Sequence, residues 1–269
     1  MSASPLPDDW ATAPSGARLY DFLCGGKNHL RAERMLGKEL LERARWLPRA
    51  AKINRAHGAL IAQYFVRQGL RLILDLGCGY PSLSNAQRNV YEAAASISAG
   101  VTVVHVDHDP VVAAHARALL TGPEGHTRAV CADVRKLDQS LVPELDPTRP
   151  WGVLLHDVLP WIPNDLEAHN LLADLRDRLP PGSAISITHL TADMHPGEME
   201  ALAAIYEEAG LPVRPRTRDQ IRELLAPWPL AEPGLVPTNR WFDDRLLSHI
   251  QDERSAAYAA VAWHPSEPR

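Results

Sequence analysis

The chain has 269 residues, of which 45% are hydrophobic and 23% are charged, and its formal net charge is −5. This composition is that of an ordinary globular protein, and the length is sufficient for one large domain with a substantial core. The excess of acidic over basic residues argues against a nucleic-acid partner, because few cations are left to neutralise phosphates. The first residues lack the apolar run of a signal peptide, and the longest uncharged stretch, residues 93–106, is too short to span a bilayer.

Cysteine and histidine usage predicts neither a disulfide framework nor a metal centre. The three cysteines are far apart, odd in number and without a CxxC pair: Cys24, Cys78 and Cys131. His105 and His108 lie close together, but neighbouring side chains of a strand point to opposite faces and do not converge on one ion. We therefore expect a reducing, cytoplasmic location.

The N-terminal quarter of the sequence differs from the rest. Residues 1–16, rich in Pro, Ser and Ala, are expected to form a flexible tail. Two helices should follow within residues 17–69, the second with Pro48 in its first turn and Gly69 at its end. Residues 70–269 are expected to form the main domain.

Short apolar strands alternate with helices in that main domain. The predicted strands are residues 71–76, 101–107, 127–132, 151–156, 183–189 and 256–263. The predicted helices are residues 83–97, 110–121, 164–179, 196–209 and a short one after Thr217, whose spacing to Gln220 is that of a capping box. This alternation predicts a mostly parallel α/β sheet with helices on both faces. Ligands of such sheets bind beyond the carboxyl ends of the strands.

Glycines and carboxylates follow the first two predicted strands. Asp75, Gly77 and Gly79 follow the first, where the glycines permit a tight turn and let the backbone approach a ligand closely. Asp107 follows the second, at a position where a carboxylate can accept hydrogen bonds from ribose hydroxyls. Asp109 is better placed to cap the next helix. These positions together predict a nucleoside site.

The identity of the nucleoside ligand follows from the remaining spacing. Asp133 and Val134 follow the third strand and pair a carboxylate with an apolar neighbour that can hold an adenine ring. NAD is disfavoured, because Ser82 occupies the third glycine position of G-x-G-x-x-G and the interval from Gly79 to Asp107 exceeds the usual one of about 20 residues. No P-loop motif occurs, so S-adenosylmethionine fits best.

The chain also resembles the actinobacterial S-adenosylmethionine-dependent methyltransferase family, over nearly its whole length. The matching segments are ARLYDFLCGGKN (17–28), NRA (54–56), the glycine loop through Pro81, VDHDP (106–110), HAR (115–117), THLT (188–191) and EPGLV (232–236). The resemblance implies a Rossmann-like methyltransferase sheet of seven strands whose last strand, near residues 258–263, runs antiparallel. It also implies that the N-terminal helices form a lid over the cofactor.

The resemblance completes the predicted cofactor site. It implies that Tyr20, Gly25, Gly26 and Lys27 belong to the lid over the methionine end, and that Arg55 meets the methionine carboxylate. The full set of residues predicted to bind S-adenosylmethionine is Tyr20, Gly25, Gly26, Lys27, Arg55, Asp75, Gly77, Gly79, Asp107, His108, Asp133, Val134, His156 and Asp157.

The expected reaction is methyl transfer to a small-molecule acceptor, in which the protein aligns the nucleophile with the methyl group and excludes water. His189 and Tyr20 are candidate bases for an acceptor hydroxyl or amine. Asp157 is a candidate for orienting the acceptor or the cofactor amine, and it is equally a candidate for capping the chain turn. Four tryptophans are candidates for lining an aromatic acceptor pocket, Trp151, Trp161, Trp228 and Trp241, although most tryptophans of a large core are expected to serve in packing.

Three departures from the family pattern bear on catalysis. Val158-Leu159-Pro160 stands where the family has Val-Leu-His, Asn28-His29 replaces an Asp-Asn pair, and about four extra residues lie between Pro81 and Asn89. Two alternatives therefore stay open. One is a cofactor-binding protein without methyl transfer, and the other is a nucleotide-dependent oxidoreductase on the same fold.

Overall fold

The computed structural model describes residues 8–81, 88–120, 122–123, 125–136, 148–242 and 251–265. Within these residues the strands are β1 (Leu72–Leu76), β2 (Thr102–Asp107), β3 (Thr127–Cys131), β4 (Trp151–His156), β5 (Ala184–Leu190), β6 (Val236–Pro237) and β7 (Ala257–Trp263). The α-helices are α1 (Gly16–Cys24), α2 (Arg31–Arg43), α3 (Leu47–Arg67), α4 (Val90–Ala95), α5 (Pro110–Leu119), α6 (Asp165–Arg178), α7 (Pro196–Glu208) and α8 (Arg218–Leu224). None of these helices combines the length and the apolarity needed to cross a membrane.

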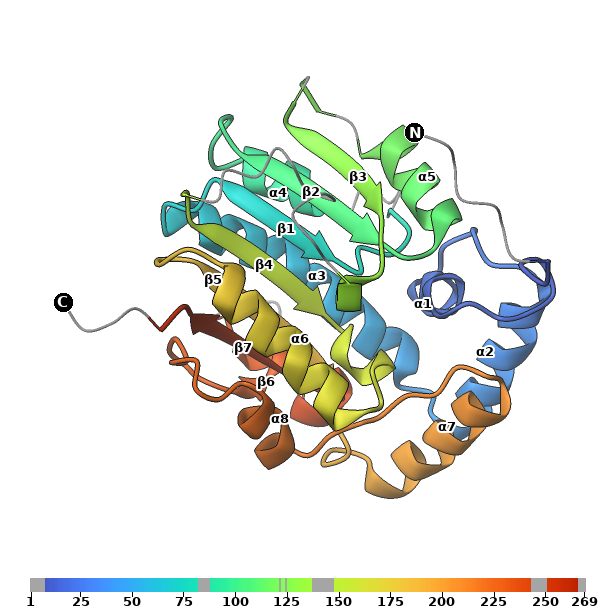
Figure 1. The fold of residues 1–269 in the computed structure, drawn as a ribbon. Coiled ribbons are helices and arrows are strands. Elements are labelled where there is room, and N and C mark those ends of the chain that lie inside the picture. Colours follow the sequence, from blue (N-terminus) through green and yellow to red (C-terminus); the bar gives the residue numbers. More distant parts are fainter. Residues whose placement is uncertain are drawn as a thin grey trace.

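The described strands form one sheet in the order β3-β2-β1-β4-β5-β7-β6 (Figure 1). Strands β1 to β5 pair in parallel, and β7 pairs antiparallel with both β5 and β6. The predicted fold, a mostly parallel sheet whose last strand is antiparallel, is therefore confirmed. The strand order reverses between β1 and β4, and a sheet of this kind binds ligands at that point.

The two faces of the sheet are buried by different helices, because successive side chains of a strand point in opposite directions. On β1, Leu72, Leu74 and Leu76 pack in the core that includes α6 and α8. Ile73 packs in the opposite core, which includes α3 and α4. All four side chains are at most 6% exposed, so β1 is buried on both sides, as expected of a central parallel strand.

The N-terminal region contains three helices where the sequence predicted two. Helix α1 ends at a left-handed Gly25 (φ 83°), and a new helix begins at Arg31. The short connection interrupts the helix, because a glycine in this conformation ends it and reverses the chain. Of the predicted helix at 83–97, the structure shows α4, capped by Asn89, and residues 82–87 lie outside the described residues.

Helices α1, α2 and α7 gather at the end of the sheet toward which the parallel strands point (Figure 1). Their apolar side chains form a third buried cluster with the first turns of α3. The later turns of α3, with Ile61 and Phe65, pack on the sheet. Helix α3 therefore belongs to both layers, and α1 and α2 are the part of residues 17–69 that lies apart from the sheet.

Residues 8–15 precede α1 and contact it. The Arg18 guanidinium lies over the Trp10 ring, 5.0 Å from its centroid, and donates to the carbonyl of Ala13. Residues 1–7 of the predicted tail lie outside the described residues.

Candidate functional site

A cavity of about 390 Å³ opens at the carboxyl ends of β1, β2 and β4, where the strand order reverses. Its size suits a cofactor of nucleoside dimensions. Most of the residues predicted to bind the cofactor line it: Tyr20, Arg55, Asp75, Gly77, Gly79, Asp107, His108, Asp133, Val134, His156 and Asp157. Segments far apart in the sequence therefore converge on one site.

The glycine loop after β1 forms the floor of the cavity. Gly77 and Gly79 both have left-handed backbones, with φ of 69° and 62°. A Cβ on Gly77 would lie 2.5 Å from Cγ2 of Val158, so no side chain fits there. Both the conformation and the close approach of β4 require glycine at this position.

Asp107 lies beside this loop at the end of β2. Its Oδ2 accepts the N–H of Gly79 and its Oδ1 accepts the N–H of Asp109, each at 3.0 Å. Burial raises the pKa of the Asp107 carboxyl, and these hydrogen bonds oppose the shift. Each oxygen keeps a further lone pair for a ligand hydroxyl. Asp109 accepts the N–H groups of Val111 and Val112 and so caps α5.

Arg55 is the cation that α3 contributes to the cavity. Its Nη1 donates to the carbonyl of Tyr80 at 2.7 Å, and its guanidinium lies 5.5 Å from the centroid of the Tyr20 ring. Its Nε is buried and has no hydrogen-bond partner among the described residues. A partly buried cation whose buried Nε has no partner among the described residues, beside a glycine loop, fits the carboxylate of a methionine moiety.

Asp75 is hydrogen-bonded to His105 inside the cavity wall. Its Oδ2 lies 2.9 Å from Nδ1 of His105, which is 1% exposed. Nε2 of His105 has no hydrogen-bond partner in the described part of the chain. His105, which the sequence suggested only as a metal ligand and then disfavoured in that role, lines the cavity.

Asp133 and Val134 lie at the rim on the β3 side. The Asp133 carboxylate accepts hydrogen bonds from Nη2 of Arg135 at 2.7 Å and from the Arg135 backbone N–H at 3.0 Å. These hydrogen bonds lower the pKa of Asp133. Arg135 also lines the cavity. His108, with its side chain 81% exposed, lies beside Asp107.

His156 and Asp157 end β4. Nε2 of His156 lies 2.9 Å from the Ser186 hydroxyl, and burial lowers the pKa of His156 to about 4, so the ring is neutral. Burial raises the pKa of the Asp157 carboxyl to about 6, although the backbone N–H of Leu190 opposes the shift. Asp157 also has a left-handed backbone, with φ of 58°.

Gly25, Gly26 and Lys27 are not among the residues that line the cavity. Gly25 and Gly26 donate their N–H groups to the carbonyls of Phe22 and Asp21, as in the turn that ends a helix. A Cβ on Gly26 would lie 2.1 Å from Oδ1 of Asp21. These residues thus form the turn after α1, and their place in the lid over the methionine end stays a prediction.

His189 is placed away from the cavity, which corrects its prediction as a base. Its Nδ1 lies 2.7 Å from the carbonyl of Leu190, and its Nε2 lies 3.1 Å from Nη1 of Arg216. Because a guanidinium only donates, Nε2 accepts and Nδ1 carries the proton. Burial lowers the pKa of His189 to about 3. The ring therefore holds Arg216 in place and has no free nitrogen for catalysis.

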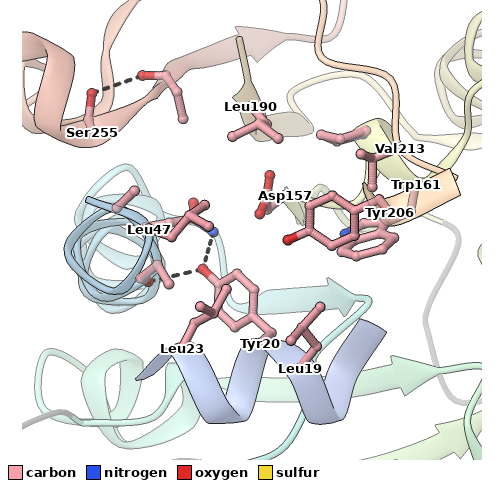
Figure 2. Close-up of a pocket in the computed structure, with 15 residues that line it drawn as sticks. Leu19, Tyr20, Leu23, Leu47, Asp157, Trp161, Leu190, Tyr206, Val213 and Ser255 are labelled. Atoms are coloured by element: carbon pink, nitrogen blue, oxygen red, sulfur yellow. Dashed lines mark hydrogen bonds between the residues drawn. The ribbon is translucent and has the colours of Figure 1, made fainter. Parts of the chain in front are cut away.

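Tyr20 lines the cavity, but its hydroxyl is engaged. It donates to the carbonyl of Ala51 at 3.0 Å and accepts from Nδ2 of Asn54 at 2.7 Å (Figure 2). The Asn54 carbonyl in turn accepts the hydroxyl of Thr188. Burial raises the pKa of Tyr20 well above its usual value. Tyr20 is thus a wall residue, and the prediction of a Tyr20 base is corrected.

Sequence reasoning missed several lining residues. Among them are Asn54, Arg135 and the segment 210–212 after α7, whereas Trp161 was one of the tryptophans expected at an acceptor pocket. Asn54 lies in the NRA segment (54–56) that resembles the family, so the sequence could have identified it. The others lie in loops whose place in the site depends on how distant elements pack.

Known proteins with the same fold were compared with this chain. The profile of a family described as S-adenosyl methyltransferase matches residues 8–265. A crystal structure of a DUF574 family protein from Streptomyces avermitilis is 31% identical, with a TM-score of 0.88, over 95% of this chain and 99% of that one. A protein from Thermobifida fusca assigned as a methyltransferase is 28% identical, with a TM-score of 0.86, over 98% and 100%.

A more distant structure shows the fold alone. Human N-acetylserotonin methyltransferase, solved in complex with S-adenosylmethionine, is 16% identical with a TM-score of 0.50, over 93% of this chain and 67% of that one. The search of curated proteins found no match.

The family profile spans most of the chain and describes S-adenosylmethionine chemistry, which supports the methyltransferase prediction over the oxidoreductase alternative. The chain belongs to the S-adenosyl methyltransferase family and is an S-adenosylmethionine-dependent methyltransferase.

Proposed function

We propose that the cavity beneath α1 holds S-adenosylmethionine and that the methyl group is transferred to a small-molecule acceptor next to Asp157. The convergence of Arg55, the glycine loop and Asp107 on one cavity supports this proposal. The Arg55 cation suits the methionine carboxylate, and the Asp107 carboxylate suits the ribose hydroxyls. The glycine loop lets the backbone lie close against the cofactor.

Each part of the cofactor has a proposed partner in the cavity. Arg55 binds the methionine carboxylate through its free donors. Asp107 accepts the ribose hydroxyls, and Gly77 and Gly79 let the backbone lie against the ligand. Val134 packs on the adenine ring, with Asp133 at its polar edge. Asp75, His108 and His156 complete the wall.

The cofactor supplies a methyl group made electrophilic by the attached sulfonium. The work left to the protein is to align the acceptor and to exclude water. Tyr20, Trp161 and Ile162 are placed for both, because they form the wall at the acceptor side of Asp157.

Helices α1 and α2 are proposed as the lid over this site. The buried ion pair of Arg18 and Glu33, at 2.7 Å, joins them. Ser15, just before α1, lies 3.4 Å from Asp109 and so connects the lid to the end of β2. The acidic net charge favours a small acceptor over a nucleic acid, and the three free cysteines fit a reducing cytoplasm.

Calorimetric titration tests the cofactor site. We expect S-adenosylmethionine and S-adenosylhomocysteine to bind and NAD not to bind. Asp107→Ala should weaken both adenosyl ligands by about 100-fold or more, because two charge-assisted hydrogen bonds to ribose are lost. Asp174→Asn removes an exposed carboxylate that pairs with Arg178 on α6 and should change nothing. Binding of NAD, or undiminished affinity in Asp107→Ala, would contradict the proposal.

A further inference from the structure

A second, smaller cavity of about 40 Å³ lies next to the cofactor cavity, between α1, α3, α7 and the end of β5 (Figure 2). The two cavities share Tyr20, Asn54, Asp157 and Trp161. The small cavity, here called the recess, therefore shares a wall with the large one, and Asp157 belongs to that wall. A water molecule needs roughly 10–15 Å³ on this measure, so the recess takes a group of about three non-hydrogen atoms.

The walls of the recess are mostly apolar. Leu19 and Leu47 come from α1 and α3 and are at most 5% exposed. Tyr206 of α7 meets Trp161 edge to face, with ring centroids 5.6 Å apart. Figure 2 shows Asp157 among these side chains, with Tyr20 and Tyr206 on either side and Leu190 nearby. A group bound in the recess thus loses its hydration shell, and Asp157 is the charged side chain that it meets there.

Three of the other polar side chains of the recess are engaged within the protein, and the Tyr206 hydroxyl also lines it, where burial and the charge of Asp157 raise its pKa. The Tyr20 hydroxyl and the Asn54 amide belong to the hydrogen-bonded chain that runs from Thr188 to the carbonyl of Ala51. The Ser255 hydroxyl donates to the carbonyl of Asp252 at 2.7 Å. Asp157 is the only charged side chain among the described residues that line the recess.

The backbone of Asp157 adds a second indication of function. Its φ of 58° is a left-handed conformation that few non-glycine residues adopt, although Asp and Asn adopt it more readily than the rest. The position is held, because the Asp157 N–H donates to the carbonyl of Thr188 at 2.9 Å. Strained non-glycine residues of this kind cluster at active sites.

We propose, resting on the function proposed above, that the recess binds the apolar end of a small aliphatic amine and that Asp157 binds its ammonium group and takes its proton. The chain is then an N-methyltransferase. A lone carboxylate in an apolar recess selects a cation, because its own charge is otherwise uncompensated.

Proton transfer also favours an amine over an alcohol. The pKa of an alkylammonium is about 10, close to that of lysine. That of an aliphatic hydroxyl is close to the value of water, about 16. With the pKa of Asp157 at about 6, the ammonium proton moves uphill by roughly four pK units and the hydroxyl proton by roughly ten. Only the first step is accessible to a carboxylate.

Proton transfer and methyl transfer follow one another at the amine nitrogen. The ammonium gives one proton to Asp157 and becomes a neutral amine. The nitrogen lone pair forms a bond to the methyl carbon while the carbon–sulfur bond breaks, and the electrons of that bond stay on sulfur and cancel its charge. The product leaves as a methylammonium ion, and the proton on Asp157 passes to water.

Binding to the protein saturated with S-adenosylhomocysteine tests the inference without turnover. Propylamine and 1-propanol have the same apolar end, and their affinities can be compared by ligand-observed NMR at pH 8. We expect propylamine to bind at least tenfold more tightly than 1-propanol. Asp157→Asn should remove this preference while the affinity for S-adenosylhomocysteine stays within about threefold. Tritium transfer from labelled cofactor to propylamine should occur in the wild type alone.

A second variant tests the recess itself. Ala50 lines the recess and not the cofactor cavity, so Ala50→Leu should abolish propylamine binding and leave S-adenosylhomocysteine binding intact. Asp174→Asn serves as the control and should behave as the wild type. Because Asp157→Asn is close to isosteric, it keeps the test decisive if Ala50→Leu does not fold.

Different binding results would overturn the role of Asp157 in amine binding and the proposed cofactor site. Equal affinity for propylamine and 1-propanol, or a preference that persists in Asp157→Asn, overturns the inference. So does a loss of more than tenfold in S-adenosylhomocysteine affinity in Asp157→Asn, which would assign Asp157 to the cofactor amine. A wild-type protein that binds no S-adenosylhomocysteine would instead refute the proposed function on which the inference rests.

Discussion

At the scale of single residues, the site is built from side chains whose protonation is set by burial and by their partners. His156 and His189 are neutral because burial lowers their pKa values to about 4 and about 3. Among the described residues the Asp157 carboxyl has no cationic partner in hydrogen-bond contact, and burial raises its pKa to about 6. Its ionisation therefore opposes folding at neutral pH, a cost that a binding or catalytic role would explain.

Asp157→Asn should therefore stabilise the ligand-free protein. Burial raises the pKa of Asp157 from its ordinary value of 3.8 to about 6 in the folded protein. At 1.36 kcal/mol per pK unit, its ionisation lowers the free energy of unfolding at pH 8 by about 3 kcal/mol at most. Asparagine tolerates the left-handed backbone. Urea unfolding should show the stabilisation at pH 8 and its decline as the pH falls from 6 to 4. Equal stability of both proteins at pH 8 would refute this account.

At the scale of elements, one buried ion pair joins α1 and α2, the helices proposed as the lid. The Glu33 carboxylate accepts Nε of Arg18 at 2.7 Å and the backbone N–H groups of Ser15 and Leu30 at 3.0 and 2.7 Å. Burial alone would raise the pKa of Glu33, but these hydrogen bonds outweigh it, and the pKa is lowered. The pair thus stabilises the fold above the unfolded pKa of Glu33, and this contribution is lost as the pH falls through the lowered folded pKa.

Glu33→Gln should loosen α1 and α2. It leaves the buried Arg18 without a counter-charge, and breaking such a pair costs about 3–5 kcal/mol. Urea unfolding measures the loss, and hydrogen exchange should show it in α1 and α2 first. Asp174→Asn, which breaks an exposed pair, should cost less than about 0.5 kcal/mol. If Glu33→Gln is no more destabilising than this control, the ion pair does not hold the lid.

At the scale of the whole molecule, the cofactor cavity joins parts of the chain that are distant in sequence. Its lining comes from α1 and α3, from the ends of β1, β2 and β4, and from the segment after α7. A ligand in this cavity contacts all of them, so its binding energy stabilises the lid and the sheet together.

S-adenosylhomocysteine should therefore raise the Tm of the entire protein in one transition. At a concentration of 100 times Kd, linkage gives about 2.7 kcal/mol, which corresponds to roughly 5–10 °C for a chain of this size. Differential scanning calorimetry with increasing ligand checks the shift, and Asp107→Ala should abolish it at the same concentrations. Two separate transitions, of which the ligand moves only one, would contradict this view.

The sequence alone determined most of the sheet and its helices, and it identified most of the strand-end residues that line the cavity. Strands such as β1 are local apolar runs, and Asp109, Asn164 and Thr217 cap the helices that follow them. Gly77, Gly79 and Asp107 could be found because parallel strands bring their carboxyl ends to one edge of the sheet, whatever the loops do.

The tertiary structure decided what depends on contacts between distant segments. His189 stands at the end of β5 like a catalytic residue, yet Arg216 of a later segment occupies its ring nitrogen. Gly26 owes its identity to Asp21, and the proton of Tyr20 is committed to Ala51 of another helix. The recess next to Asp157 exists only because α1, α3 and α7 meet there. Local sequence patterns determine backbone geometry. The chemistry available to a side chain depends on its neighbours, and these are set by tertiary packing.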